Sequence, residues 1–157
     1  MTIKTIEDEN FNHYKNPSMV IAFPHCTFKC EKECGIECCQ NSTLFTSSSH
    51  EIPISSVIER YLDNNLTSAI VLAGLEPMDD FDQLLDFIIK FREISSDDIV
   101  IYTGYYKTEV EKQIKKLSIY NNIIVKFGRY IPNQQKHMDD VLGVELASKN
   151  QYAERIN

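Results

Sequence analysis

Five cysteines lie within fourteen residues near the start of the chain, and the rest of the chain has none. They are Cys26, Cys30, Cys34, Cys38 and Cys39. Thiolates are soft ligands that suit zinc, copper(I) and iron–sulfur clusters. Disulfides in so short a stretch are typical of secreted mini-folds, but the cysteine number is odd and the N-terminus is polar and acidic, unlike a signal peptide. The pattern therefore predicts a metal site in a cytoplasmic protein.

Three kinds of metal site compete for these cysteines. Structural zinc normally takes four ligands, often as two Cys-x2-Cys pairs, whereas three residues separate each successive pair from Cys26 to Cys38. A ferredoxin-type electron carrier uses four cysteines per cluster, usually with the last one distant or followed by proline. A [4Fe–4S] cluster held by three cysteines leaves one iron open, and an open position is what makes a metal site catalytic. We expect this third kind, and a non-catalytic zinc or iron–sulfur module stays the alternative.

The chain after the first seventeen residues alternates between apolar runs and amphipathic periodicity, which predicts an α/β fold. Strands are expected at 18–23, 69–73, 99–103 and 122–127, and helices at 53–64, 80–91 and 108–117. Strands that alternate with helices favour parallel pairing through right-handed crossovers. We therefore expect a short parallel sheet with crossover helices.

Segments that could bind a ligand directly follow the expected strands. They are the cysteine loop, 74–77, 103–104 and 128–129. Ligands of parallel sheets bind at the carboxyl ends of the strands, so we expect these segments to share one edge of the sheet.

The length of the chain favours a single core. With 157 residues, 43% of them hydrophobic, the chain 1–157 is expected to form one domain. Outside the alternating strands and helices, we expect an N-terminal extension at 1–17, the metal-binding loop at 24–43, a loop at 133–140 and a last strand within 141–147.

Charge and hydropathy exclude two classes of partner. The net charge is −7 and the isoelectric point is about 5.1, which argues against nucleic acid, because phosphate binding needs concentrated lysine and arginine. The longest apolar run, 68–74, is too short to span a bilayer. We expect partners that are neither nucleic acid nor membrane.

Two motifs at the expected sheet edge resemble those of radical S-adenosylmethionine enzymes. Cys26-x3-Cys30, directly after the first expected strand, resembles the cluster loop of that family, Cys-x3-Cys-x2-Cys. Residues 72–77, Leu-Ala-Gly-Leu-Glu-Pro, look like its Gly-Gly-Glu-Pro motif. Three further segments are similar, in order and spacing, to segments of the small activating proteins of anaerobic ribonucleotide reductases: 101–105, 128–130 and 147–151. The resemblance runs from about Val20 to Gln151 and implies a partial (βα) barrel of the radical S-adenosylmethionine type.

The resemblance also implies the ligands of a [4Fe–4S] cluster. Cys26 and Cys30 match the first two cysteines of the loop, and the third ligand must be Cys34, Cys38 or Cys39. We favour Cys39, since Cys39-Gln-Asn resembles the Cys-aromatic-Asn end of the loop in the activating proteins, and Cys34 is the next choice. The insertion that this choice requires, 31–38, would form a bulge in the loop.

S-adenosylmethionine is the second cofactor that the resemblance implies. Gly74, Leu75 and Glu76 would line its amino-acid end, and Thr103, Gly104 and Asn150 are expected to bind the rest of it. The chain departs from the family pattern at Leu75, which replaces a glycine, at Phe127, which stands where aspartate often precedes Gly-Arg, and at Tyr152, which replaces the terminal arginine. The four histidines share no spacing, so no catalytic role is predicted for them.

The activity implied by the resemblance is reductive cleavage of S-adenosylmethionine to methionine and a 5′-deoxyadenosyl radical, which abstracts hydrogen. The expected partners are a glycyl radical enzyme, such as anaerobic ribonucleoside-triphosphate reductase, and a flavodoxin- or ferredoxin-like electron donor. The alternative enzyme is a minimal radical enzyme that acts on a peptide or a small molecule.

Overall fold

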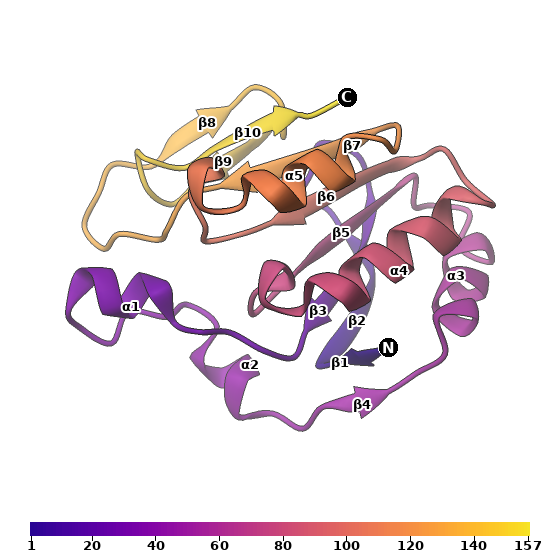
Figure 1. Cartoon of the computed structure of the whole chain (residues 1–157), viewed down its shortest axis with the longest axis horizontal. Coiled ribbons are helices and arrows are strands. Elements are labelled where there is room, and N and C mark those ends of the chain that lie inside the picture. The colour runs from indigo at the N-terminus through magenta and orange to yellow at the C-terminus, as the bar shows by residue number, and fades with distance from the viewer.

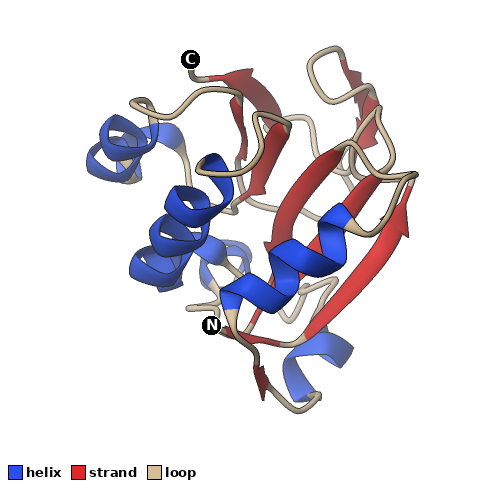
Figure 2. Cartoon of the chain, turned by 90° about the vertical axis from the view of Figure 1, so that its right-hand side faces the viewer, coloured by secondary structure: helices blue, strands red, loops and turns tan.

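A computed structural model describes residues 1–157, and its centre is a six-stranded mixed sheet (Figure 1). The strand order is β10-β7-β6-β5-β3-β2. The strands, in chain order, are β2 (Thr5–Asn10), β3 (Ser18–Phe23), β5 (Ala69–Gly74), β6 (Asp98–Tyr102), β7 (Ile123–Phe127) and β10 (Tyr152–Arg155). The four central strands pair in parallel, whereas β2 and β10 pair antiparallel at the two edges. The C-terminus lies at the top of the molecule and the N-terminus well below it in both views (Figures 1 and 2).

The central strands form where apolar, β-branched runs can be buried on both faces of a sheet. Every residue of β3 and β7 is buried, as are the first five of β5. Alternate residues then face opposite ways: Met19 and Ile21 join the core beneath the helices, and Val20 joins a second cluster on the other face.

The two faces of the sheet are covered differently. One face packs against three helices, α3 (Ile54–Leu62), α4 (Phe81–Arg92) and α5 (Glu111–Leu117). The other face is covered by Tyr14 from the β2–β3 connection and by Leu142 and Leu146 near a small hairpin of β8 (His137–Asp139) and β9 (Val144–Leu146). That second face therefore leaves room near the ends of the strands.

The remaining elements are short. They are β1 (Thr2–Ile3), which pairs with β4 (His50–Glu51), the helices α1 (Lys29–Cys34) and α2 (Ser42–Thr46), and the 3₁₀ turns η1 (Pro77–Asp80) and η2 (Lys107–Glu109). None of the helices is both long and apolar enough to cross a membrane.

The expected parallel core is confirmed, and the expectations for the segments before and after it are partly wrong. The strand at 18–23 has the predicted bounds, β5 and β7 differ from the prediction by one residue at one end, and β6 is shifted by one residue at both ends. The extension 1–17, for which no strand was predicted, contains β1 and β2, and the loop expected at 133–140 contains β8. The last strand expected within 141–147 is confirmed as β9. The helix expected at 108–117 is divided into η2 and α5.

Gly74 and Gly35 provide a matched test of backbone packing. Gly74 has φ +92°, and a Cβ there would lie 2.6 Å from the Ala22 Cα on β3. Gly35, at φ +71°, has no atom within 4 Å of the same position. Gly74→Ala is expected to lower the free energy of unfolding by about 3 kcal/mol, because it combines backbone strain with overpacking. Gly35→Ala should cost only about 1 kcal/mol. Urea unfolding measures both, and equal losses would contradict the packing argument.

Candidate metal centre

A cavity of about 480 Å³ lies where the parallel strands end, on the face of the sheet that carries no long helix. Of the five cysteines, Cys26, Cys30 and Cys39 line it, and Cys34 and Cys38 do not. Five of the six residues expected to bind S-adenosylmethionine also line it: Gly74, Leu75, Glu76, Thr103 and Gly104. The sixth, Asn150, lies outside the lining and donates to the Arg129 carbonyl at 3.0 Å, whereas its neighbour Gln151 lines the cavity.

The cysteine loop follows β3, and backbone N–H groups hold it in place around Cys26, the first candidate ligand. The Phe28 N–H donates to Cys26 Sγ at 3.2 Å, and the Thr27 N–H donates to Asp79 Oδ2 at 2.6 Å. Asp79 belongs to η1, directly after the Glu76 motif. The first cysteine is therefore fixed against the segment that follows β5.

The expected bulge at 31–38 is instead a turn of helix with a tight reversal. Helix α1 ends at Gly35, whose left-handed backbone donates its N–H to the Glu31 carbonyl at 2.8 Å. The chain then returns, and the Cys39 N–H donates to Glu31 Oε1 at 3.1 Å. A helix that begins at Lys29 and reverses at Gly35 thus brings Cys39 to the same cavity wall as Cys30.

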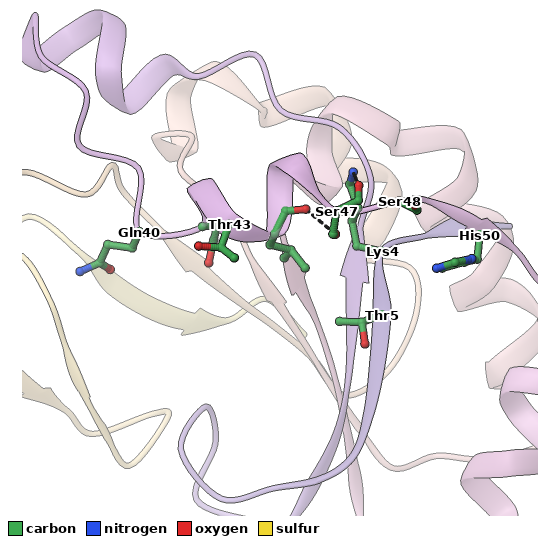
Figure 3. A pocket seen from close by; sticks show the side chains of 9 residues that line it. Lys4, Thr5, Gln40, Thr43, Ser47, Ser48 and His50 are labelled. Atoms are coloured by element: carbon green, nitrogen blue, oxygen red, sulfur yellow. Dashed lines mark hydrogen bonds between the residues drawn. The ribbon is translucent and has the colours of Figure 1, made fainter.

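The end of the loop is joined to the sheet by polar contacts. Asn41 donates to the Gly74 carbonyl at 2.7 Å. Further on, the Lys4 ammonium donates to the carbonyls of Phe45 and Ser47 at 3.0 Å and 2.5 Å. These contacts adjoin a second hollow of about 580 Å³, lined mostly by polar residues (Figure 3). It shares Thr5, Gln40, Asn41 and Leu44 with the cavity. The segment around Asn41 therefore separates the two hollows.

Arg129, in the loop after β7, connects helix α1 to the sheet edge. It donates to both carboxylate oxygens of Glu109, at 2.6 Å and 2.7 Å, and its Nε lies 2.9 Å from Glu33 Oε2 on α1. The guanidinium also lies over the Tyr106 ring, 4.5 Å from the centre. The hydrogen bonds from Arg129 lower the pKa of Glu109 to about 2, because they favour the charged carboxylate. One largely buried cation thus holds two acids from different segments.

Glu76 is buried and fully engaged by its neighbours. Its Oε1 accepts hydrogen bonds from the Thr103 hydroxyl at 2.7 Å and the Met78 N–H at 3.1 Å. Its Oε2 accepts one from the Gly104 N–H at 2.8 Å. Burial outweighs these bonds and raises the pKa of Glu76 to about 7.

Gly104 lets a cysteine and a carboxylate approach the same backbone position. A Cβ there would lie 3.3 Å from Cys30 Sγ and 3.4 Å from Glu76 Oε2. A side chain would enter the space between these two groups. The bare backbone of Gly104 therefore forms part of a cradle between a soft metal ligand and an acid.

The thiols of Cys26 and Cys30 are protonated at neutral pH in the metal-free protein. Burial raises the pKa of Cys26 to about 12 and also raises the pKa of Cys30. Metal binding to such thiols must release protons. No group of three or more histidine, cysteine or acidic side chains converges on one point to bind a single metal ion. A four-iron cluster does not need such convergence, since each cysteine binds a different iron, and three thiols around one cavity fit that donor set.

A family model described as a 4Fe-4S single cluster domain matches residues 19–152. The chain belongs to this family. No curated protein and no solved structure matches the chain. Membership supports an iron–sulfur protein with a [4Fe–4S] cluster, and the cysteines of this cluster domain all lie in the matched stretch.

The cluster domain has cavity residues that the sequence did not indicate. Thr5, Glu7, Asn12 and His13 precede the family match, yet they line the cavity. Asn10 Oδ1 accepts hydrogen bonds from the backbone N–H groups of Asn12 and His13 and lies 2.7 Å from His13 Nδ1. His13 Nδ1 must therefore carry the proton, which leaves Nε2 as an acceptor.

Lys126 is a further cavity residue that was not predicted from the sequence. A signal for it was present, since it is the one charged residue in the apolar run of β7. No pattern marked His13, because its position depends on how the β2–β3 connection folds back over the sheet.

Glu109→Gln tests the ion-pair network. The variant is expected to lose about 1 to 2 kcal/mol of unfolding free energy at neutral pH, since it removes the charged partner of a nearly buried guanidinium. The pKa of Glu109 is lowered from 4.5, so the stabilisation is present above about pH 4.5 and is lost as the pH falls towards about 2. The difference from wild type should therefore shrink in acid, as measured by urea unfolding at neutral pH and near pH 3.

Asp86→Asn is the matched control, because Asp86 forms an exposed ion pair with Lys90 at 2.9 Å. Its expected cost is less than about 0.5 kcal/mol. Equal losses in the two variants, or a Glu109→Gln deficit that persists in acid, would contradict the assigned role of the network.

Proposed function

We propose that this cluster domain is a radical S-adenosylmethionine enzyme that activates a glycyl radical enzyme. One observation carries the proposal: three cysteines of one loop share a cavity with the segments Gly74–Glu76 and Thr103–Gly104, which follow the next two parallel strands. These are the segments whose motifs resemble the cofactor-binding motifs of that superfamily. The four parallel strands, with helices on one face and the cavity on the other, support a partial (βα) barrel.

The proposed cluster ligands are Cys26, Cys30 and Cys39. Their shared cavity wall supports Cys39 as the third ligand. Cys34 does not line the cavity and its thiol lies 3.7 Å from the Tyr130 carbonyl, and Cys38 contacts Cys34. With three ligands, one iron is left for a second cofactor.

When bound, the reduced cluster would supply the electron that cleaves the carbon–sulfur bond of S-adenosylmethionine. The protein's own part is to position that cofactor and to limit access of water. Glu76 is preorganised for an amino group, because Thr103 and Gly104 fix both of its oxygens before a ligand binds. Asn41, which donates to the Gly74 carbonyl, holds this motif against the cysteine loop.

The partner enzyme and the electron donor are proposed from the resemblance. The ordered segments 101–105, 128–130 and 147–151 are similar to those of anaerobic ribonucleotide reductase activating proteins. A flavodoxin- or ferredoxin-like protein would supply the electron. Five free cysteines support a reducing cytoplasmic setting.

Anaerobic reconstitution with iron and sulfide tests the proposal. The dithionite-reduced protein should give a [4Fe–4S] EPR signal that changes on addition of S-adenosylmethionine, and 5′-deoxyadenosine should accumulate. A cluster whose EPR signal does not change on addition of S-adenosylmethionine would overturn the radical function. The protein would then be an electron-carrying cluster domain. A glycyl radical signal in an added anaerobic ribonucleotide reductase tests the partner separately.

Single cysteine variants test the ligand set. Cys26→Ala, Cys30→Ala and Cys39→Ala should each lose most of the four irons per chain, because a thiolate ligand is removed. Cys34→Ala and Cys38→Ala are the matched controls and should keep iron, sulfide and the EPR signal near wild-type levels. Retention of the cluster in Cys39→Ala with loss in Cys34→Ala would transfer the third position to Cys34.

A further inference from the structure

Two side chains of opposite charge are buried in the wall of the cavity. Glu76 is 4% exposed and Lys126 is 6% exposed. Charged side chains are almost never this buried without a partner of opposite charge. Neither residue forms a salt bridge, with the other or with any third residue.

Thr103, directly after the strand between them, contacts both residues. Its N–H donates to the Lys126 carbonyl at 2.9 Å, and its hydroxyl donates to Glu76 Oε1. Lys126 comes from β7 and Glu76 follows β5, so the two residues flank β6. The two residues thus reach one cavity from either side of β6.

The Lys126 ammonium has unused hydrogen-bonding capacity. It donates to the Gly128 carbonyl at 2.9 Å, and its Nζ lies 5.9 Å from the centre of the Tyr102 ring. An ammonium has three donors, so two remain for a ligand. Burial lowers the pKa of Lys126 to about 8 and raises that of Glu76 to about 7, because each charge is removed from water.

We propose that Glu76 and Lys126 together form a receptor for the zwitterionic end of an α-amino acid, in which Lys126 holds the carboxylate. A ligand with an ammonium and a carboxylate on one carbon offers the opposite charge to each residue. The inference deepens the proposed function and rests on it, since the methionine end of S-adenosylmethionine is such a group. Lys126 is then a specificity-determining residue that none of the recognised motifs contains.

The test compares two ligands that differ only in the carboxylate. S-adenosylmethionine and its decarboxylated analogue, which keeps the amine, are titrated by anaerobic calorimetry into the cluster-loaded protein. Lys126→Met should lower the affinity for S-adenosylmethionine by about tenfold or more and change the affinity for the analogue by less than about twofold. Only the first ligand loses a charged hydrogen bond. Any contribution of the iron is present in both proteins, so the change in the ratio of affinities reports on Lys126.

Two further variants keep the inference falsifiable. Lys29→Met removes another cation of the cavity wall, one paired with Glu109 at 3.4 Å, and should leave the ratio unchanged. Lys126→Arg should retain most of the preference for S-adenosylmethionine over its decarboxylated analogue. If Lys126→Met does not fold, Lys126→Arg is compared with Lys126→Gln instead. Equal weakening of both ligands by Lys126→Met would overturn the receptor. Loss of iron from that variant would also overturn the receptor. It would indicate that Lys126 instead stabilises the thiolate of Cys30, whose pKa its charge lowers.

A second pair of ligands separates this inference from the proposed function. A wild-type preference for L-methionine over L-methioninamide that disappears in Lys126→Met, without any cleavage of S-adenosylmethionine, would uphold the receptor and reject the radical enzyme. Cleavage of S-adenosylmethionine with no change of ratio in Lys126→Met would uphold the enzyme and reject the receptor.

Discussion

Parallel pairing of β3, β5, β6 and β7 is the constraint on which the rest of the structure depends. Strands that pair in parallel run in one direction, so the segments that follow them emerge at one edge. Phe23 pairs with Gly74, and Tyr102 pairs with Lys126, so the cysteine loop, the Glu76 motif and the lysine reach the same cavity. The close approach of Gly74 to Ala22 makes the first of these pairings depend on glycine, because a Cβ at residue 74 would overlap with β3.

The cysteine loop depends on a different kind of interaction from the sheet. Helix α1 buries none of its residues, whereas the central strands are almost entirely buried. The loop is instead held by hydrogen bonds and charge, as in the contacts of Arg129 with Glu33 and of Asp79 with Thr27. Polar contacts near solvent contribute less than apolar burial, so a bound cluster would add its stabilisation mainly to this loop.

The sequence predicted the parts of the fold that apolar patterning controls. The run 18–23 could be assigned because both faces of that strand are buried. Strand β2, Thr-Ile-Glu-Asp-Glu-Asn, could not, because backbone pairing with β3 overrides its low strand propensity. For the same reason the two antiparallel edges of the sheet were missed. Within the site, spacing and resemblance located Cys39 and Glu76, but only the fold places Lys126 and His13 on the cavity wall.

Strand β2 also determines how the molecule presents its outer sheet edge to other proteins. An open edge of backbone N–H and C=O groups is a template for pairing with a strand of another chain. Here that edge carries Glu7, Asp8 and Glu9, and its register is interrupted between Glu7 and Asn10. Asp8 is further tied sideways to Arg60 of α3 at 2.5 Å. A second copy would bring the same acids into contact, so charge and irregularity protect this edge against self-association into extended sheets.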